Sequence, residues 1–403
     1  MKRKKNGWTR LLAVACAVLL LAQLLAVIAF AEDSVTIGGQ TVSVNVQRLD
    51  LRGCALSDIS ALAGLTRLTE LNLSGNQITD LSPLTQLTKL TILDLSDNQI
   101  ISVAPLAGLK GLKKLFIQNN QIEQALPLAS LTALNEVRME NNPATDLLAL
   151  GALPNLRALA VSTDDLESLS QLKQVSTLAV RGEQIDDLVP LLKMTQLRAL
   201  SVHSDALTDV ALLPLLTKLT RLSLSAPNLA DLAPLAQMKT VQALTLSCAE
   251  IADLRPLGKM PALSELSLYC QTLGDVSVLG GAKKLSVLSL SADVMPDLSA
   301  LASFKRLHTL SLRSGSMQDL SCVAAVTQLT ELSVRGEELT DITALANLKA
   351  LKRVAIHSAV RVDCTPLAGL EKLRDLTLGG GSYAPEQMYL LDGMLPQCRI
   401  YFE

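Results

Sequence analysis

A 22-residue period organises most of this chain. One unit, written from Leu68, reads LTELNLSGNQITDLSPLTQLTK, and the next, from Leu90, reads LTILDLSDNQIISVAPLAGLKG. The pattern L-x-x-L-x-L-x-x-N-x-I-x-D-L-x-P-L-x-x-L recurs, with substitutions at single positions, through sixteen consecutive units, of which the sixth is shortened to 19 residues. Repetition at this period is typical of a solenoid, in which each coil packs only against its neighbours. The units start at Val46, Leu68, Leu90, Leu112, Leu134, Leu156, Val175, Leu197, Leu219, Val241, Leu263, Leu285, Leu307, Leu329, Leu351 and Leu373.

Each unit has the pattern of one short strand followed by one tight turn. The L-x-L alternation at positions four to six predicts a strand with one apolar face. Strands of successive units, stacked in parallel about 4.8 Å apart, would satisfy their backbone groups along the array. The later Leu residues recur at three-residue spacing, which favours a 3₁₀ turn because side chains at i and i+3 then share a face. Aromatic residues make up only 2% of the chain, so aliphatic side chains must fill the thin core.

An aspartate at position 13 precedes the expected turn in most units. Such a side chain caps the free N–H groups at the start of a helical turn. Capping is favoured over calcium binding, because one carboxylate per coil lacks the clustered oxygens that calcium prefers. Ser102 and Ser168 replace the aspartate in two units. The aspartates are Asp58, Asp80, Asp146, Asp187, Asp209, Asp231, Asp253, Asp275, Asp297, Asp319, Asp341 and Asp363.

These motifs resemble the internalin-type leucine-rich repeat of bacteria, the 22-residue class, over nearly all of the chain after residue 31. The resemblance implies an α/β solenoid, a curved right-handed array with a parallel β-sheet on its concave side and short 3₁₀ turns on its convex side. It also implies that a protein partner binds to the concave face.

Residues 1–31 differ in composition from the rest. Five basic residues precede an apolar run from Leu11 to Phe30. The sequence Ala29-Phe30-Ala31 then has the small-x-small pattern of a signal peptidase site. The run also approaches the length of a membrane span, so cleavage after Ala31 and retention as an N-terminal anchor both stay open. In either case we expect a secreted or cell-surface protein that contacts a membrane only through this segment.

The ends of the array need covers, because a terminal coil exposes its hydrophobic cross-section. Residues 32–45 contain VTIGGQTVSVNV, whose alternation around Gly38-Gly39 predicts a hairpin cap. The sixteen repeats are expected over 46–394, followed by a capping strand over 395–403.

The charge and motif content argue against several function classes. Residues 1–31 hold five of the 36 basic and none of the 38 acidic residues, so the remaining chain has a formal net charge of −7. An acidic body argues against nucleic-acid binding. His203 and His357 stand seven units apart, roughly 34 Å by strand spacing, and cannot share a metal or proton relay. Because zinc-site spacings and catalytic signatures are also absent, we predict no enzyme activity and no cofactor.

Two zones differ along the array. Asn occupies position nine of units two to five, where an amide ladder can bond backbone groups, and it is absent from later units. Position five, on the exposed strand face, changes from mostly polar or bulky residues to Ala, Ser and Thr at the same boundary. A smooth floor could let a partner's backbone approach closely, or it could reflect tandem duplication of one unit; both interpretations stay open. The asparagines are Asn76, Asn98, Asn120 and Asn142.

Exposed strand positions supply the candidate binding residues. Arg suits such a surface because its planar fork grips carboxylates, and Tyr offers rigid amphipathic area. We expect a protein or peptide partner with acidic character in the C-terminal third, although these side chains could instead only be solvated. The expected site is Tyr269, Arg313, Arg335, Arg353 and His357, and a secondary patch is Phe116, Arg138, Glu136 and Glu140.

Cys248 and Cys270 both stand at position eight, one period apart. Equivalent Cα atoms in adjacent coils lie about 5 Å apart, within the range of a disulfide. Side chains that point the same way on parallel strands can strain such a bridge, so a disulfide and two free thiols both stay open.

The leading functional hypothesis is an extracellular protein-binding scaffold, an adhesin or a receptor-like module. A structural envelope spacer without a specific partner is the alternative. Carbohydrate binding is disfavoured, because sugars usually need exposed aromatic platforms and this chain has few aromatic residues.

Overall fold

The computed structural model describes residues 34–380, 390–391 and 393–402. The expected export segment, residues 1–31, lies outside the described residues. The chain divides into two compact units, Met1–Val161 and Ser162–Glu403. In the part of the chain that is described, no helix combines the length and apolarity needed to cross a membrane.

The first unit begins with an antiparallel hairpin of β1 (Ser34–Ile37) and β2 (Gln40–Ser43). The strands that follow pair in parallel, each in register with the strand one repeat later. They are β3 (Arg48–Asp50), β4 (Glu70–Asn72), β5 (Ile92–Asp94), β6 (Lys114–Phe116), β7 (Glu136–Arg138) and β8 (Ala158–Ser162). The connecting 3₁₀ turns are η1 (Ser60–Gly64), η2 (Ser82–Leu84), η3 (Ala104–Gly108), η4 (Leu126–Ser130) and η5 (Leu147–Ala152).

The second unit continues the same design with a parallel sheet and short helical turns. The strands of its main sheet are β9 (Thr177–Arg181), β10 (Ala199–His203), β11 (Arg221–Ser225), β12 (Ala243–Ser247), β14 (Glu265–Tyr269), β16 (Val287–Ser291), β17 (Thr309–Arg313), β18 (Glu331–Arg335), β19 (Arg353–His357), β20 (Asp375–Gly379) and β21 (Arg399–Phe402). A small parallel pair is β13 (Glu250–Ile251) and β15 (Thr272–Leu273). The turns are α2 (Leu166–Leu169), η6 (Val189–Lys193), η7 (Leu213–Leu215), η8 (Ala233–Gln237), α3 (Arg255–Gly258), η9 (Val276–Gly281), η10 (Ser299–Ser303), η11 (Ser321–Val323), η12 (Thr343–Asn347) and η13 (Thr365–Gly369).

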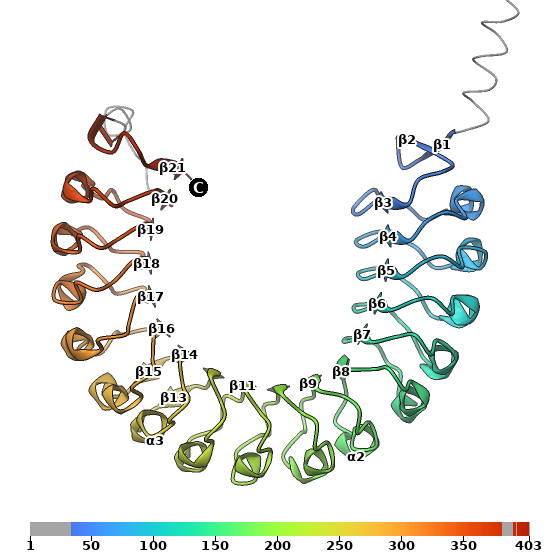
Figure 1. Ribbon diagram of the computed structural model, residues 1–403, viewed down its shortest axis with the longest axis horizontal. Coiled ribbons are helices and arrows are strands. Elements are labelled where there is room, and N and C mark those ends of the chain that lie inside the picture. The colour runs from blue at the N-terminus through green and yellow to red at the C-terminus, as the bar shows by residue number, and fades with distance from the viewer. Residues whose placement is uncertain (1–33, 381–389, 392, 403) are drawn as a thin grey trace, which may run out of the picture. The chain divides into compact units, whose positions relative to one another are not determined.

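Within each unit the strands line the inner side of an arc of coils and the helical turns lie on the outer side (Figure 1). The inner side is called the concave face below. Between strands and turns runs a core of Leu, Ile and Val, such as Leu71, Leu84 and Leu87, which are at most 2% exposed. The predicted solenoid with parallel strands and short 3₁₀ turns is confirmed.

The zone boundary seen in the sequence coincides with a change in backbone conformation. Strands β3 to β7 end after three residues, and position eight of their units has positive φ, between 55° and 67°. Strand β8 and the strands of the second unit's main sheet as far as β20 run for five residues. In their repeats, Gly380 is the one described residue with positive φ at position eight. Gly, Asp and Asn tolerate this left-handed conformation better than other residues. The five early residues are Gly53, Gly75, Asp97, Asn119 and Asn141.

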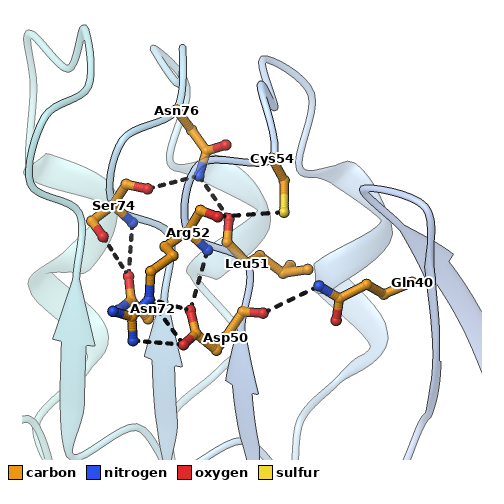
Figure 2. A network of polar contacts seen from close by, with 8 residues as sticks. All are labelled: Gln40, Asp50, Leu51, Arg52, Cys54, Asn72, Ser74 and Asn76. Atoms are coloured by element: carbon orange, nitrogen blue, oxygen red, sulfur yellow. Dashed lines mark hydrogen bonds and ion pairs between the residues drawn. The ribbon is translucent and has the colours of Figure 1, made fainter. Parts of the chain in front are cut away.

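The asparagine ladder holds the turn after each early strand. Asn76 donates from its side-chain nitrogen to the carbonyls of Leu51 at 2.9 Å and Leu73 at 2.8 Å, in two adjacent coils. Its side-chain oxygen accepts from the backbone N–H of Leu56 at 2.9 Å. Figure 2 shows this amide above the polar residues of β3 and β4. Because Asn98 and Asn120 repeat the arrangement, the predicted ladder is confirmed.

In three repeats of the second unit, a serine at position eight bonds to the preceding coil. The Ser204 hydroxyl donates to the carbonyl of Ile185 at 2.9 Å, and the Ser358 hydroxyl donates to the carbonyl of Leu339 at 2.8 Å. Both serines are fully buried. The strands before these serines extend to position seven, and neither serine has the positive φ found at position eight of the early repeats.

The aspartate caps are confirmed in all but one of the predicted units. In a typical case Ser82 donates its backbone N–H to Asp80 at 2.8 Å. The side-chain hydrogen bond from Ser82, together with this backbone bond, lowers the pKa of Asp80, and the side-chain bond from Arg255 lowers the pKa of Asp253 to about 2. Such caps stabilise the fold above the ordinary pKa of 3.8, and the contribution is lost as the pH falls through the lower folded-state pKa.

Two capping predictions are corrected. Asp146 accepts from Ala125 and Leu126 in the preceding coil at 2.6 and 2.8 Å, because that coil has no aspartate of its own at position 13. In the shortened sixth unit Asp165 caps α2, accepting from the backbone N–H of Ser168 at 3.0 Å. The predicted cap, Ser168, is therefore the donor.

Candidate functional site

Three of the predicted binding residues form a continuous row. Arg313, Arg335 and His357 end β17, β18 and β19, and the sheet register pairs Arg313 with Arg335 and Arg335 with His357. Both guanidinium groups are exposed, and neither forms an ion pair with another described residue. These three residues are called the basic row below. Two cations held about 5 Å apart at their backbones repel each other, so an anion that bridges them would be stabilised.

Tyr269 belongs to the same repeat position but stands apart from the basic row. It ends β14, and Ser291 of β16 lies between it and Arg313 in the sheet register. Its side chain is 45% exposed. A partner that covers Tyr269 and Arg313 together must therefore also span the small side chain of Ser291.

Arg353 differs from the other predicted site residues because its charge is compensated. It starts β19 and forms an ion pair with Glu331 on β18. The next two strands repeat the arrangement, since Arg399 pairs with Asp375 at 2.7 Å. Opposite charges therefore alternate along the strand starts, and this edge of the face carries little net charge.

A shallow hollow lies beside the basic row, over β17 to β20. Its volume is about 260 Å³. Ser311, Ser333, Ala355 and Thr377 form a smooth floor at position five, consecutive in the sheet register. Because position five lies between positions three and seven on one strand face, the floor separates the compensated edge from the basic row.

The secondary patch in the first unit is largely self-compensated. Glu136 pairs with Lys114 at 3.0 Å and with Arg138 at 3.1 Å. Burial raises the pKa of Glu136, but the hydrogen bonds and charges of Lys114 and Arg138 together bring it below its ordinary value. The Arg138 guanidinium also lies over the Phe116 ring, 5.4 Å from its centroid. Lys114, Glu136 and Arg138 already neutralise one another, which leaves less charge for a partner to satisfy.

Glu140 is the one member of that patch with a buried side-chain oxygen atom that lacks a hydrogen bond to a described residue. Its Oε2 atom is buried and has no hydrogen-bond partner among the described residues, and the same holds for Oε1 of Gln118, one coil earlier. Phe116, by contrast, borders a hollow of about 370 Å³ over β3 to β6. Its lining includes the ion-paired residues Arg48 and Glu70.

Reasoning from the sequence missed Arg181. It ends β9 at position seven and is exposed, like Arg313 and Arg335, but its register partner on the next strand is His203. Its repeat position would have revealed it. Among the described residues no cluster of three or more His, Cys, Asp or Glu side chains could hold a metal ion.

The two cysteines at position eight are free thiols in the structure. Burial is the main cause that raises the pKa of Cys248 and of Cys270 to about 11. The thiolate that attacks an oxidant or a disulfide is therefore scarce at neutral pH. We expect thiol counting on the denatured chain of residues 32–403 to give six thiols, and a count of four would demonstrate the disulfide.

Comparison with known proteins agrees with this architecture. A family profile described as a leucine-rich repeat region matches residues 28–365. None of the curated proteins compared matches the chain. A leucine-rich-repeat protein of Leptospira interrogans shares the fold, with 19% identity, a TM-score of 0.51 and coverage of 89% of this chain and 90% of that one.

Two internalins of Listeria monocytogenes are also similar. InlF has 23% identity and a TM-score of 0.45, covering 86% of this chain and 90% of that one. Internalin C2 has 28% identity and a TM-score of 0.40, covering 53% of this chain and 87% of that one. The leucine-rich repeats expected from the motifs are confirmed. The family is typically a non-enzymatic, protein-binding scaffold. With most of its length matched by the family profile, the chain belongs to the leucine-rich-repeat family.

Proposed function

We propose that this chain is an extracellular protein-binding scaffold that holds an acidic, extended segment of a partner on the concave face of its second unit. The observation that carries the proposal is the basic row, in which Arg313 and Arg335 are adjacent, exposed and without ion pairs to described residues. Arginine forks bind carboxylates bidentately, and two of them on adjacent strands fit carboxylates spaced along one segment.

The floor beside the basic row supports an extended occupant. Ser311, Ser333 and Ala355 leave room for a main chain to lie close to the strands. Tyr269 adds an amphipathic surface two strands away on the same row. Arg353 is given a smaller role than its type suggests, because Glu331 already neutralises it.

A structural spacer is the competing function. It would require no particular side chains on the concave face, so binding of an acidic segment that depends on the basic row separates the two. Selective capture from surface and culture-fluid proteins would then identify the natural partner.

Reversing the charge of one arginine in the basic row should weaken this binding. We expect Arg313→Glu and Arg335→Glu each to weaken the binding of a short oligoglutamate peptide roughly tenfold or more, because each replaces an attraction with a repulsion. Isothermal titration calorimetry at fixed ionic strength measures the change.

Matched controls lie on the same face. Arg181→Glu changes the same repeat position on β9, and Arg138→Glu changes the secondary patch of the first unit. Both should bind the peptide like the unaltered chain. If Arg138→Glu alone lost binding, the site would belong to the first unit instead.

The extracellular location rests on residues 1–31. We expect the exported protein to begin at Glu32 and to show tyrosine fluorescence only, since Trp8 is the single tryptophan of the chain. Intact-mass measurement of exported material tests this. A mass that includes residues 1–31 would instead favour an N-terminal anchor.

A further inference from the structure

A third hollow is lined by residues from the two segments where η9 leads into β16 and η10 leads into β17. Its volume is about 360 Å³. The residues that line it include three cations and no acidic side chain: Lys283, Lys305 and Arg306. The chain as a whole has slightly more acidic than basic residues, so a cavity lined by one sign of charge is a local exception.

The charge arrangement is confined to two adjacent coils. Lys283-Lys284 and Lys305-Arg306 fill the last two positions of the units that start at Leu263 and Leu285. Every other full-length repeat between Val46 and Leu373 has at most one cation at these two positions. Tandem duplication of a common unit therefore does not account for the four adjacent cations.

The hollow itself arises from a break in the core pattern. Position 20 is filled by Leu, Met, Val or Phe in the other units that start between Val175 and Leu351, but by Ala282 in this one. The missing side-chain volume is bordered by the ring of Phe304 in the next coil, whose Cε1 atom would lie 3.3 Å from a Cβ on Gly280. Ala282 and Phe304 are both buried, so the floor is apolar while the rim is basic.

The cations at the rim have spare bonding capacity. Lys283 donates one bond from Nζ to the carbonyl of Gly280 at 2.8 Å, which holds its ammonium group in place and leaves two N–H groups. Lys305 and Arg306 are exposed and form no ion pair with another described residue. Three cations that line one hollow, one of them with a planar arginine fork, suit the charge and the oxygen atoms of a phosphate group.

We propose that this hollow is an anion site that binds a phosphate group, separate from the partner site on the concave face. The Lys283 ammonium and the Arg306 guanidinium contact the phosphate oxygens, Lys305 adds a third charge, and the apolar floor excludes water behind them. The phosphate could belong to a soluble compound or to a lipid headgroup, and the chemistry of recognition is the same for both.

The test is calorimetric titration of the full exported chain with inorganic phosphate and with pyrophosphate at constant ionic strength. We expect saturable binding at one site. Lys305→Gln combined with Arg306→Gln should weaken it at least about tenfold, because the site loses two of its charged donors. Lys239→Gln is the matched control, since Lys239 has the same repeat position but stands alone in its coil, and it should bind like the unaltered chain.

Ala282→Leu tests whether phosphate binding requires the hollow itself or only the positive charge of the surface around it. It restores the residue type of the neighbouring coils, fills the hollow and leaves every charge in place, so binding should fall about tenfold with an unchanged net charge. Lys305 and Arg306 are exposed, so replacing both with glutamine should not disturb the core. This paired variant therefore tests the site even if Ala282→Leu strains the core. The proposal is overturned if the unaltered chain shows no saturable binding, if Lys239→Gln loses as much affinity, or if a folded Ala282→Leu binds equally well.

Co-sedimentation with vesicles distinguishes the two sources of phosphate. Binding to phosphatidylglycerol vesicles, but not to phosphatidylcholine vesicles, that is lost in the paired glutamine variant assigns the phosphate to a lipid headgroup. Calorimetric binding of phosphate without co-sedimentation assigns it to a soluble compound.

Discussion

Leu224→Asp is expected to unfold the coils around β11, with a loss of about 5 kcal/mol in the free energy of unfolding. Leu224 is fully buried, and so are its register partners Val202 and Leu246 on the neighbouring strands. The substitution removes apolar contacts to both adjacent coils and leaves a carboxylate without a partner in the core. Urea denaturation followed by circular dichroism measures the loss.

Ser223→Asp is the matched control, one residue away. Ser223 is half-buried on the opposite face of β11. A new carboxylate there reaches solvent over the smooth floor, so the free energy of unfolding should change by less than about 1 kcal/mol. Similar losses in the two variants would mean that the alternation of side chains along β11 is not the one described.

Asn120→Ala is expected to lower the free energy of unfolding of the first unit by about 3 kcal/mol. The amide donates to the carbonyls of Leu95 at 2.9 Å and Ile117 at 3.0 Å, and it accepts from the N–H of Ile100 at 3.0 Å. The residue is only 8% exposed, so water cannot readily replace it. Alanine would leave these backbone groups without partners, which costs more than the mean value of a hydrogen bond.

Asp205→Ala tests whether that loss is specific to the asparagine ladder. Asp205 occupies the same repeat position in the second unit, where its side chain is exposed. The change should alter the free energy of unfolding by less than about 0.5 kcal/mol. An equally large loss would show that position nine has the same structural role in both units.

The fold expected from the repeats does not show which charged residues of the concave face remain available to bind a partner. Arg313, Arg335 and Arg353 look equivalent as exposed arginines at odd strand positions. The register of the sheet sets Arg353 against Glu331 and sets Arg313 against Arg335, so the first is neutralised and the other two are not. Whether an arginine is neutralised depends on the residue at the same position of the adjacent repeat, because the strands pair in register.

The sequence alone determined the period, the buried face of each strand, the asparagine ladder and nearly all of the aspartate caps. Each of these follows from residues within one unit or at the same position of the next, because a solenoid makes only such contacts. Because the repeats are regular, the core residues and the exposed rows can be predicted from the sequence alone.

Only the tertiary structure decided the features that depend on how two unlike coils meet. Asp146 caps the preceding coil, because that coil has no aspartate where the others have one. In three later repeats, a serine at position eight bonds to a carbonyl of the preceding coil where the early repeats use asparagine. The hollow above Ala282 exists because Phe304, one coil later, borders the space without filling it. In each case one coil departs from the repeat, and the consequence depends on a contact with a neighbouring coil. The packing of the two coils determines that contact, and the repeat pattern does not predict it.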